Sequence, residues 1–381
     1  MDDMSTGMIG YDVPAAVGMT LDEIATPALV IDLDAFERNL DRMAAFAAKA
    51  GVRLRAHAKT HRSADIALIQ MARGGACGMC CQTVSEADAL VRGGVSDVLV
   101  TNEVVDPRML DRLADLAGKA AVAVCVDDVS VVPLLSAAAS RFGSTLTCLV
   151  EIDCGGGRCG VGSPEDALAI AKAVAGGPGL MFGGLHAYHG SAQHIRDPQD
   201  RKAAIDAAIS KAAETVRVLE AAGLVCATVT GAGTGSFPFE AGSGVYTELQ
   251  CGSYIFMDAD YCRVGDATGE GVGGFENALF VFTSVVSVAG AGRAVCNAGL
   301  KAHSIDSGLP VVHGRVGLTY RTASDEHGVI DDPDGVLALN DRLLLVPGHC
   351  DPTCNLHDWY VGVRDGRVEC LWPVTARGKS Y

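Results

Sequence analysis

Basic residues recur at every second position of one short stretch, RAHAKTHR, which runs from residue 55 to residue 62. If the stretch is a strand, one of its two faces carries four basic groups: Arg55, His57, Lys59 and His61. Groups of like charge repel one another, so we expect this face to point at an anionic ligand. Like charge and burial are expected to lower the pKa of Lys59, which favours the free amine that forms a Schiff base. A surface lysine at the end of a strand is the alternative interpretation.

Two glycine-rich turns, VTGAGTGSF at residues 229–237 and QCGSYIF at residues 250–256, are candidates for anion binding. Successive backbone N–H groups in such turns form concave sites for phosphate groups. The first turn also resembles a dinucleotide-binding fingerprint through Gly231, Gly233 and Gly235. The spacing of these glycines does not match that fingerprint and no helical pattern follows, so we favour a phosphate-binding turn. An ordinary loop is the remaining alternative.

Arg158 and Tyr188 are candidates for contacts to a planar ligand. Arg158 stands among glycines in EIDCGGGRCGVG, so its guanidinium has few neighbours and is free to contact an anion or a ring. Tyr188 in HAYHG shares a face with His186 and Gly190 and is placed to flank a ring. A solvated loop for Arg158 and ordinary core or rim packing for Tyr188 are the alternatives.

His349 and Asp351 lie two residues apart in the segment PGHCDPTCNLHDWY. In an extended backbone they share a face and Cys350 points away. A histidine with a carboxylate suits Mg²⁺ or Mn²⁺, with water and substrate completing the coordination. Zinc bound by Cys350, Cys354 and His349 or His357 is an alternative, but structural zinc sites usually have a second closely spaced pair, which this sequence lacks. A polar turn between strands is the interpretation without a metal.

Short apolar strand patterns alternate with helical patterns from about residue 52 to residue 257. Eight strands with helical crossovers predict an α/β fold, a parallel (β/α)8 barrel, with a doubly wound sheet as the second choice. One crossover helix is expected to begin at Ser163 and to end at Gly176. Active sites of such barrels lie at the carboxyl ends of the strands, and Lys59 is expected to end the first strand. The glycine-rich turns follow the seventh strand and contain the eighth, where such barrels often bind phosphate.

A ninth strand, PALVIDLD at residues 27–34, cannot belong to an eight-stranded barrel. The helix after it is expected to begin with a capping box of Asp34 and Glu37 and to end at Gly51. From about Gly273 onward the chain alternates strands with turn signals and shows little helix. The sequence therefore predicts two domains, a barrel formed by residues 35–270 and a β domain formed by residues 1–34 and 271–381.

The chain of 381 residues has a net charge of −16 and no basic tract, so a nucleic-acid partner is not expected. Its longest apolar runs stop far short of the roughly 18 residues that span a bilayer, and no membrane partner is expected. The N-terminal MDDMSTGMIG lacks the features of a signal peptide. The fourteen cysteines are scattered rather than arranged as a disulfide framework, which indicates reduced thiols and a cytoplasmic location.

An ordered set of motifs resembles the D-threonine aldolase and D-serine dehydratase family: TPALVIDLDAFERN, RAHAKTHR, EIDCGGGRCGVG, GLHAYHG, the glycine turns and PGHCD. Members of this family are pyridoxal-phosphate enzymes with an alanine-racemase-like fold. The resemblance runs from about residue 25 to the C-terminus, and within the family the chain is most similar to the enzymes that act on 3-hydroxyaspartate. The resemblance also implies a homodimer with its sites near the subunit interface.

The resemblance assigns roles to the candidate residues. Lys59 matches the lysine that binds pyridoxal phosphate as a Schiff base. The other implied cofactor contacts are Gln82 and Arg158 at the ring and its 3-hydroxyl, Tyr188 facing the ring, and Thr234, Gly252 and Ser253 at the phosphate. His349 and Asp351 match a divalent-metal pair over the substrate.

The resemblance implies retro-aldol cleavage of 3-hydroxy-D-aspartate to glycine and glyoxylate, with pyridoxal phosphate as the electron sink and the metal near the β-oxygen. Dehydration of 3-hydroxyaspartate or D-serine to an oxo acid and ammonia is the alternative, as is cleavage of D-threonine. Family dehydratases tend to have His-x-Cys with zinc, whereas aldolases have His-x-Asp, and position 351 is an aspartate. The resemblance therefore favours an aldolase whose partner is a small β-hydroxy amino acid.

Three further expectations concern the substrate and the remaining rival functions. A second carboxylate on the substrate requires a nearby cation, which the basic stretch offers at four positions: Arg55, His57, His61 and Arg62. Racemisation would need a second base across the ring and has no use for a metal pair. A catalytically silent cofactor-binding protein would keep Lys59 but would not need His349 and Asp351.

Overall fold

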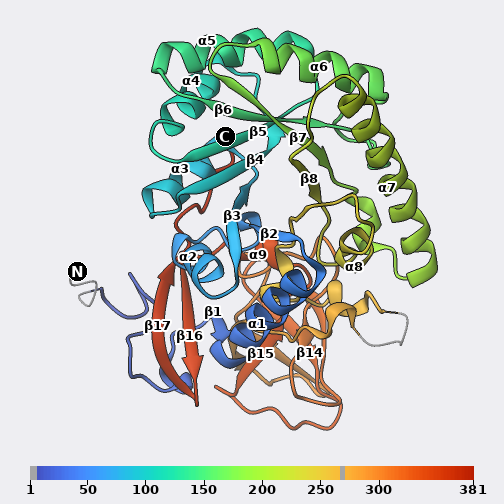
Figure 1. Ribbon diagram of the computed structural model, residues 1–381. Coiled ribbons are helices and arrows are strands. Elements are labelled where there is room, and N and C mark those ends of the chain that lie inside the picture. The colour runs from blue at the N-terminus through green and yellow to red at the C-terminus, as the bar shows by residue number, and fades with distance from the viewer. Residues whose placement is uncertain (1–6, 267–270) are drawn as a thin grey trace.

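The computed structural model describes residues 7–266 and 271–381. It contains a closed barrel with helices around its outside and a nine-stranded sheet, and Figure 1 shows the two next to each other with helix α1 where they meet. The fold class expected from the sequence is confirmed. The predicted domain boundary at residue 270 lies outside the described residues. So do residues 1–6, which make up most of the N-terminal segment in which the sequence shows no signal-peptide features. The boundary at residues 34 and 35 stays a prediction.

Eight parallel strands form the barrel in chain order, and β9 pairs with β2 to close it. The strands are β2 (Arg53–His57), β3 (Ala76–Cys81), β4 (Asp97–Glu103), β5 (Ala121–Val126), β6 (Leu146–Glu151), β7 (Leu180–Ala187), β8 (Thr228–Gly231) and β9 (Glu248–Leu249). Near-continuous apolar runs such as AVAVCV in β5 form these strands because both faces are covered, one by the barrel interior and one by helices.

Helices follow most of the barrel strands. They are α2 (Ala64–Ala72), α3 (Val84–Arg92), α4 (Pro107–Leu116), α5 (Val132–Phe142), α6 (Pro164–Gly176), α7 (Pro198–Ala221) and α8 (Phe237–Ala241). Side chains cap the first turns of four of them, where Thr83, Asp106, Ser163 and Asp197 each accept a backbone N–H of the following helix. The predicted start of α6 at Ser163 and its end at Gly176 are confirmed.

Short 3₁₀ turns join these elements. They are η1 (Leu21–Glu23), η2 (Ala58–Thr60), η3 (Val129–Val131), η4 (Ser191–His194), η5 (Ser253–Ile255), η6 (Tyr261–Arg263) and η7 (Val272–Gly274). The turns η2, η4, η5 and η6 follow the barrel strands β2, β7 and β9 along the chain. They therefore lie at the end of the barrel where an active site is expected.

The nine-stranded sheet joins segments from both ends of the chain. Its strands are β1 (Ala28–Asp32), β10 (Leu279–Ser287), β11 (Arg293–Cys296), β12 (Val311–Val312), β13 (Thr319–Ala323), β14 (Gly328–Asp331), β15 (Arg342–Val346), β16 (Trp359–Arg364) and β17 (Arg367–Pro373), with one short helix, α9 (Cys350–Cys354), between β15 and β16. β1 lies between β10, to which it is antiparallel, and β16, to which it is parallel. The ninth predicted strand therefore does pair with strands from the other end of the chain.

Helix α1 (Leu33–Ala50) connects β1 to the barrel. It begins earlier than predicted, because Asp32 is its cap and accepts two N–H groups of the first turn at 3.0 Å. The expected capping box of Asp34 and Glu37 is therefore wrong: β1 ends at Asp32 and the helix starts at the next residue. Gly51 ends the helix in a left-handed conformation with φ of 69°, as predicted.

The buried face of α1 joins the barrel to the sheet. The ring centroid of Phe36 lies 6.3 Å from that of Phe256, which follows the barrel, and 5.8 Å from that of Trp372 in β17. Burial of one such phenylalanine contributes roughly 1.5–3 kcal/mol. The two parts of the chain therefore share one core. Among the described residues, no helix is long and apolar enough to cross a membrane.

Candidate active site

A cavity with an empty volume of about 640 Å³ lies at the carboxyl ends of the barrel strands. Every residue that we expected to contact the cofactor lines it: Lys59, Gln82, Arg158, Tyr188, Thr234, Gly252 and Ser253. These residues follow different strands of the barrel, as in other barrel active sites. Their roles toward a cofactor stay predictions.

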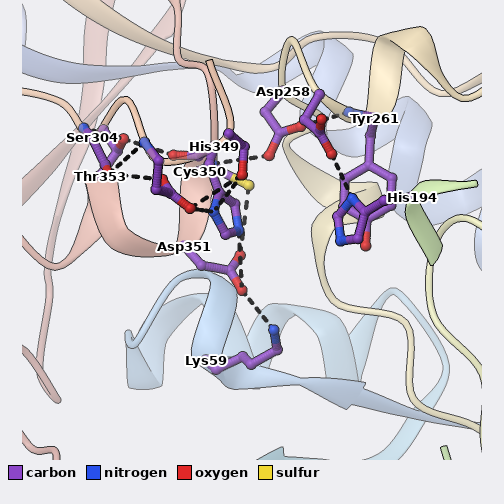
Figure 2. Close-up of polar contacts among 12 residues, drawn as sticks. Lys59, His194, Asp258, Tyr261, Ser304, His349, Cys350, Asp351 and Thr353 are labelled. Carbon is purple, nitrogen blue, oxygen red and sulfur yellow. Dashed lines mark hydrogen bonds and ion pairs between the residues drawn. The ribbon is translucent and has the colours of Figure 1, made fainter. Parts of the chain in front are cut away.

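Lys59 lies in the turn η2, because β2 ends at His57. Its Nζ donates to Asp351 Oδ2 at 2.8 Å, as Figure 2 shows. The charge of the Asp351 carboxylate raises the pKa of Lys59 above its usual range, even though burial opposes this. The expected lowering of the lysine pKa is therefore wrong, because the dominant neighbour is an anion from a distant part of the chain.

The other basic residues of the alternating stretch do not form one cationic face. Arg55 lies at the opposite end of the barrel, where two carboxylates bind its guanidinium. Burial lowers the pKa of His61 to about 4, and Arg62 donates to the Asn355 side chain at 3.0 Å. His57 does line the cavity, but burial lowers its pKa well below the usual range, so its ring is neutral. The expectation of a shared basic face is wrong, and of these four residues only His57 lines the cavity.

Arg158, Tyr188 and Gln82 are anchored at the cavity wall. The guanidinium carbon of Arg158 lies 5.9 Å from the centroid of the Tyr188 ring, within the range of a cation–π contact. Its Nη2 lies 3.9 Å from Glu151 Oε1. The Gln82 side chain donates to the carbonyl of Thr101 at 3.3 Å. A guanidinium, an amide and an aromatic ring thus surround the same space, which fits a planar ligand with polar edges.

The glycine-rich turns form a pocket with free hydroxyl groups. The hydroxyls of Thr60 and Thr234 are buried and have no hydrogen-bond partner among the described residues. A Cβ at position 252 would lie 2.6 Å from Thr60 Oγ1 and 2.8 Å from the His57 carbonyl, so only glycine fits there. Buried hydroxyls without partners are costly unless a ligand binds them. These groups fit a phosphate held by hydroxyls and backbone N–H groups.

Two local predictions at these turns are wrong. A short helix, α8, does follow the first turn and begins at Phe237. The eighth strand is limited to residues 248–249, and Ser253 begins the turn η5 instead of continuing the strand. Strand pairing ends early because the backbone at Gly252, with φ of −115° and ψ of −59°, is no longer extended.

His349 and Asp351 approach each other at the start of α9, with His349 Nε2 3.9 Å from Asp351 Oδ2. Asp351 lies in the first helical turn, so the expected extended backbone is wrong and Cys350 is buried beside Asp351. Although burial raises it, the charges of Lys59 and His349 hold the pKa of Asp351 well below its usual range. An ionised carboxylate facing an imidazole nitrogen fits a divalent cation. In this structure the Lys59 ammonium donates to Asp351 Oδ2, the oxygen that faces His349.

Asp306 belongs to this site although the sequence analysis missed it. Its Oδ2 lies 2.8 Å from His349 Nδ1, and the Ser304 hydroxyl donates to its other oxygen at 2.7 Å. A carboxylate at Nδ1 orients a metal-binding imidazole and leaves Nε2 for the metal. No sequence signal marks Asp306, because it lies in a loop more than forty positions before His349.

The geometry does not support the zinc alternative. In residues 7–266 and 271–381, no cluster of three possible metal ligands includes Cys350, Cys354, His349 or Asp351, so a metal ion here would need ligands from water or substrate. His357 instead places its Nε2 at 2.7 Å from the carbonyl of Ala302. The pair that this segment places at the cavity is the nitrogen of His349 and the carboxylate of Asp351.

Two further residues that were not predicted from the sequence lie at the cavity or beside it. Tyr261 lines it, and the ring of His194 lies against Tyr261 with centroids 5.4 Å apart. His194 Nδ1 lies 2.5 Å from Asp260 Oδ2. Figure 2 shows the outer ends of both rings on the side of the site that holds Lys59. Both residues stand in 3₁₀ turns, where neither strand nor helix periodicity applies, so no periodic pattern in the sequence indicates them.

Comparisons with known proteins agree with this site. The family model described as alanine racemase, N-terminal domain, matches residues 31–260, and that described as putative serine dehydratase domain matches residues 278–363. A 3-hydroxy-D-aspartate aldolase of Paracoccus denitrificans (strain Pd 1222) is 56% identical over 382 residues, with 100% of this chain and 99% of that protein covered. The chain belongs to the alanine racemase-fold family of pyridoxal-phosphate aldolases and dehydratases. The resemblance inferred from the motifs is confirmed.

Aldolases and dehydratases of this family differ in their similarity to the chain. The crystal structure of D-threonine aldolase from Filomicrobium marinum has a TM-score of 0.94 at 49% identity and covers 97% of this chain and 100% of that one. The D-threo-3-hydroxyaspartate dehydratase of Delftia sp. (strain HT23) is 30% identical, with 92% of this chain and 97% of that protein covered. Within the family, the chain is thus more similar to these aldolases than to this dehydratase.

Proposed function

We propose that this protein is an aldolase that uses pyridoxal phosphate and a divalent metal ion to cleave 3-hydroxy-D-aspartate to glycine and glyoxylate. The observation that carries the proposal is the pair of His349 and Asp351 beside Lys59 at the cavity. Crystal structures of the related D-threo-3-hydroxyaspartate dehydratase include variants of a histidine and of a cysteine two positions further on, the latter in a metal-free form. The same spacing occurs here with aspartate as the second residue, which supports a harder ion such as Mg²⁺ or Mn²⁺.

The cavity residues divide into four groups according to the part of the cofactor that they would contact. Pyridoxal phosphate, when bound, supplies the electron sink for the electron pair of the broken Cα–Cβ bond. Lys59 would bind its carbonyl carbon, and the other contacts would be Gln82 and Arg158 at the ring and 3-hydroxyl, Tyr188 at the ring face, and Thr234, Gly252 and Ser253 at the phosphate. Borohydride reduction and peptide mass spectrometry test the first assignment, and a pyridoxyl group on any other lysine would contradict it.

Lys59 has to lose a proton before it can attack a carbonyl carbon. Its ammonium binds the Asp351 oxygen that faces His349 Nε2, which is also where the metal ion is proposed to bind. A divalent cation at that oxygen would repel the ammonium and remove the interaction that raises the lysine pKa. Metal binding and the free amine of Lys59 would therefore favour each other.

His194 is the group best placed to accept the proton of the β-hydroxyl. Both nitrogens of the His57 ring have hydrogen-bond partners. Nδ1 accepts the backbone N–H of Lys59 at 3.3 Å, and Nε2 lies 3.1 Å from the Thr101 hydroxyl. Burial raises the pKa of Tyr261 well above its usual range, so its hydroxyl keeps its proton. His194 has an Nε2 without a partner in the part of the chain that the structure describes. It therefore remains as the available base.

Chelation followed by metal addition tests the proposed reaction. The protein is loaded with pyridoxal phosphate, treated with a chelator, and assayed for glyoxylate release from 3-hydroxy-D-aspartate and acetaldehyde release from D-threonine. We expect glyoxylate release to stop on chelation and to return with Mn²⁺, at a higher kcat/KM than for D-threonine. Undiminished activity after chelation would remove the metal from the proposal, and a preference for D-threonine would change the substrate.

We also propose that the protein is a cytoplasmic homodimer. All fourteen cysteines are free in the structure, which is typical of proteins from reducing compartments. The homodimer rests on the family alone. Light scattering on the purified protein tests it, and a monomer mass at working concentration would contradict it.

A further inference from the structure

The carboxylate of Asp260 lies beside the cavity and is held by three cationic side chains. Its Oδ2 lies 2.5 Å from His194 Nδ1, and its Oδ1 accepts from Arg263 at 2.9 Å and from Arg196. Only 7% of the side chain is exposed. The backbone is also fixed, because the Asp260 N–H donates to the Gly348 carbonyl at 3.2 Å and the Asp260 carbonyl accepts from Arg196 at 2.7 Å. The carboxylate therefore has one defined position.

The two arginines determine which hydrogen bond the carboxylate makes to His194. Although burial raises it, the contacts with Arg196, Arg263 and His194 hold the pKa of Asp260 below its usual range. An ionised carboxylate accepts hydrogen bonds and cannot donate, so the shared hydrogen lies on His194 Nδ1. The lone pair of the neutral imidazole is then on Nε2, the nitrogen without a partner among the described residues.

Tyr261 connects this histidine to the metal pair. Its ring lies 5.4 Å from the His194 ring, and its N–H donates to Asp258 Oδ1 at 2.9 Å. Asp258 Oδ2 in turn accepts the N–H of Cys350 at 2.9 Å, at the start of the helix that carries Asp351. Figure 2 shows this wall, with His194 and Tyr261 at one end and Asp351 at the other.

We propose that Asp260 is a positioning residue that fixes the tautomer and orientation of His194, so that Nε2 faces the substrate as the proton acceptor. The inference rests on the proposed aldolase function. When the O–H bond of the β-hydroxyl breaks, its proton goes to Nε2 and its electron pair forms the carbonyl of glyoxylate. The electron pair of the Cα–Cβ bond goes to the electron sink, and one proton returned to Cα gives glycine. The reaction therefore needs no further reactant.

A double-mutant cycle on the holoenzyme tests the proposal. We expect His194→Ala to lower kcat on the order of 100-fold and Asp260→Asn to lower it about tenfold, with KM changed less than about threefold. In the His194→Ala background, Asp260→Asn should have no further effect, because it acts through the missing imidazole. Arg263→Gln, which leaves the bond between His194 and Asp260 in place, should give a smaller loss that also disappears in that background.

The pH profile supplies a readout that a purely structural role would not change. His194 contacts Asp260 and Tyr261, and Arg196 and Arg263 bind the same Asp260 carboxylate. Asp260 carries the negative charge among these groups, and Asp260→Asn removes it. Asp260→Asn should therefore move the acid limb of kcat/KM to lower pH.

Asp88 offers a matched control, since Arg92 and Arg112 both pair with its carboxylate, which is 9% exposed and contacts no histidine. Asp88→Asn should leave kcat and the pH profile unchanged. If the losses of His194→Ala and Asp260→Asn multiply in the double variant, or if the acid limb does not move, Asp260 does not act through His194. A parent protein that releases no glyoxylate would instead refute the proposed function.

Discussion

The ion pair between Lys59 and Asp351 links the two reactive parts of the cavity at the scale of single residues. The lysine is the expected cofactor anchor and the aspartate is the expected metal ligand, and they share one hydrogen bond of 2.8 Å. In the absence of both ligands, each residue therefore stabilises the charged form of the other. Removal of the Lys59 charge should therefore change the affinity of Asp351 for a metal ion, and removal of the Asp351 charge should change the affinity of Lys59 for the cofactor.

Lys59→Met removes the ammonium that competes with a metal ion for Asp351. We expect the cofactor-free variant to bind Mn²⁺ about tenfold more tightly than the parent, since the competing cation is gone. Electron paramagnetic resonance of free Mn²⁺ during a titration measures the affinity. Lys172→Met, an exposed lysine on α6, is the control and should not change it. Weaker Mn²⁺ binding by Lys59→Met would show that the two cations do not compete.

Glu86 gives a pH-dependent prediction. It is 0% exposed on α3 and accepts the Gln82 N–H at 3.0 Å, and burial raises its pKa from 4.5 to about 7. The folded protein therefore holds a proton that the unfolded chain releases, so stability falls as pH rises from the unfolded pKa to the folded pKa. The loss is roughly 3 kcal/mol at most. Glu86→Gln should raise the urea midpoint at pH 8 and leave it nearly unchanged at pH 5; an equal shift at both values would contradict this.

At the scale of elements, the groups proposed to react stand on 3₁₀ turns that follow barrel strands. Lys59 lies on η2, His194 on η4, Ser253 on η5 and Tyr261 on η6. A turn at the end of a strand directs side chains over the mouth of the barrel, whereas a strand would alternate them between the barrel interior and the helices. Close backbone approach between these turns makes the small residue Gly252 necessary.

Gly252→Ala should weaken cofactor binding more than it weakens the fold. The added Cβ would lie 2.6 Å from Thr60 Oγ1 and 2.8 Å from the His57 carbonyl, so η2 and η5 have to separate at the proposed phosphate site. We expect the affinity for pyridoxal phosphate, measured by equilibrium dialysis, to fall about tenfold or more. Gly176→Ala, where a Cβ meets nothing within 4 Å, is the control. Unchanged affinity of Gly252→Ala would place the phosphate elsewhere.

At the scale of the whole molecule, the site forms where the barrel meets the segment between β15 and β16. Lys59 comes from the barrel, whereas Asp351 and His349 come from α9 and the residue before it. The shared core around Phe36 keeps the two parts in register. Loops of the second part therefore contribute to the site, and one of them carries Asp306, which contacts His349.

Asp306→Asn should lower metal affinity without removing a proposed ligand. The carboxylate holds His349 Nδ1 at 2.8 Å, and loss of such a partner typically costs about 10- to 100-fold in affinity. Isothermal titration with Mn²⁺ measures the change. Asp325→Asn, on the exposed part of the same region, should bind Mn²⁺ like the parent. Equal affinities for both variants would remove Asp306 from the site.

Much of this architecture follows from local patterns in the sequence. Alternation of apolar runs with helical periodicity predicts the barrel, and the surplus strand at residues 27–34 predicts the second sheet. The cavity also gathers every predicted cofactor contact. Local patterns cannot show that Arg55 points to the far end of the barrel or that Asp351 sets the charge of Lys59, because these depend on partners up to 292 positions away. They also miss His194, whose 3₁₀ turn has no periodicity to detect.

Identification of the products formed from 3-hydroxy-D-aspartate, with added pyridoxal phosphate and Mg²⁺, decides between cleavage and dehydration. We expect glycine and glyoxylate in equal amounts, because the Cα–Cβ bond breaks while the β-hydroxyl becomes a carbonyl. Oxaloacetate and ammonia would mean that the hydroxyl leaves instead. That result would make the protein a dehydratase and would contradict the inference drawn from aspartate at position 351.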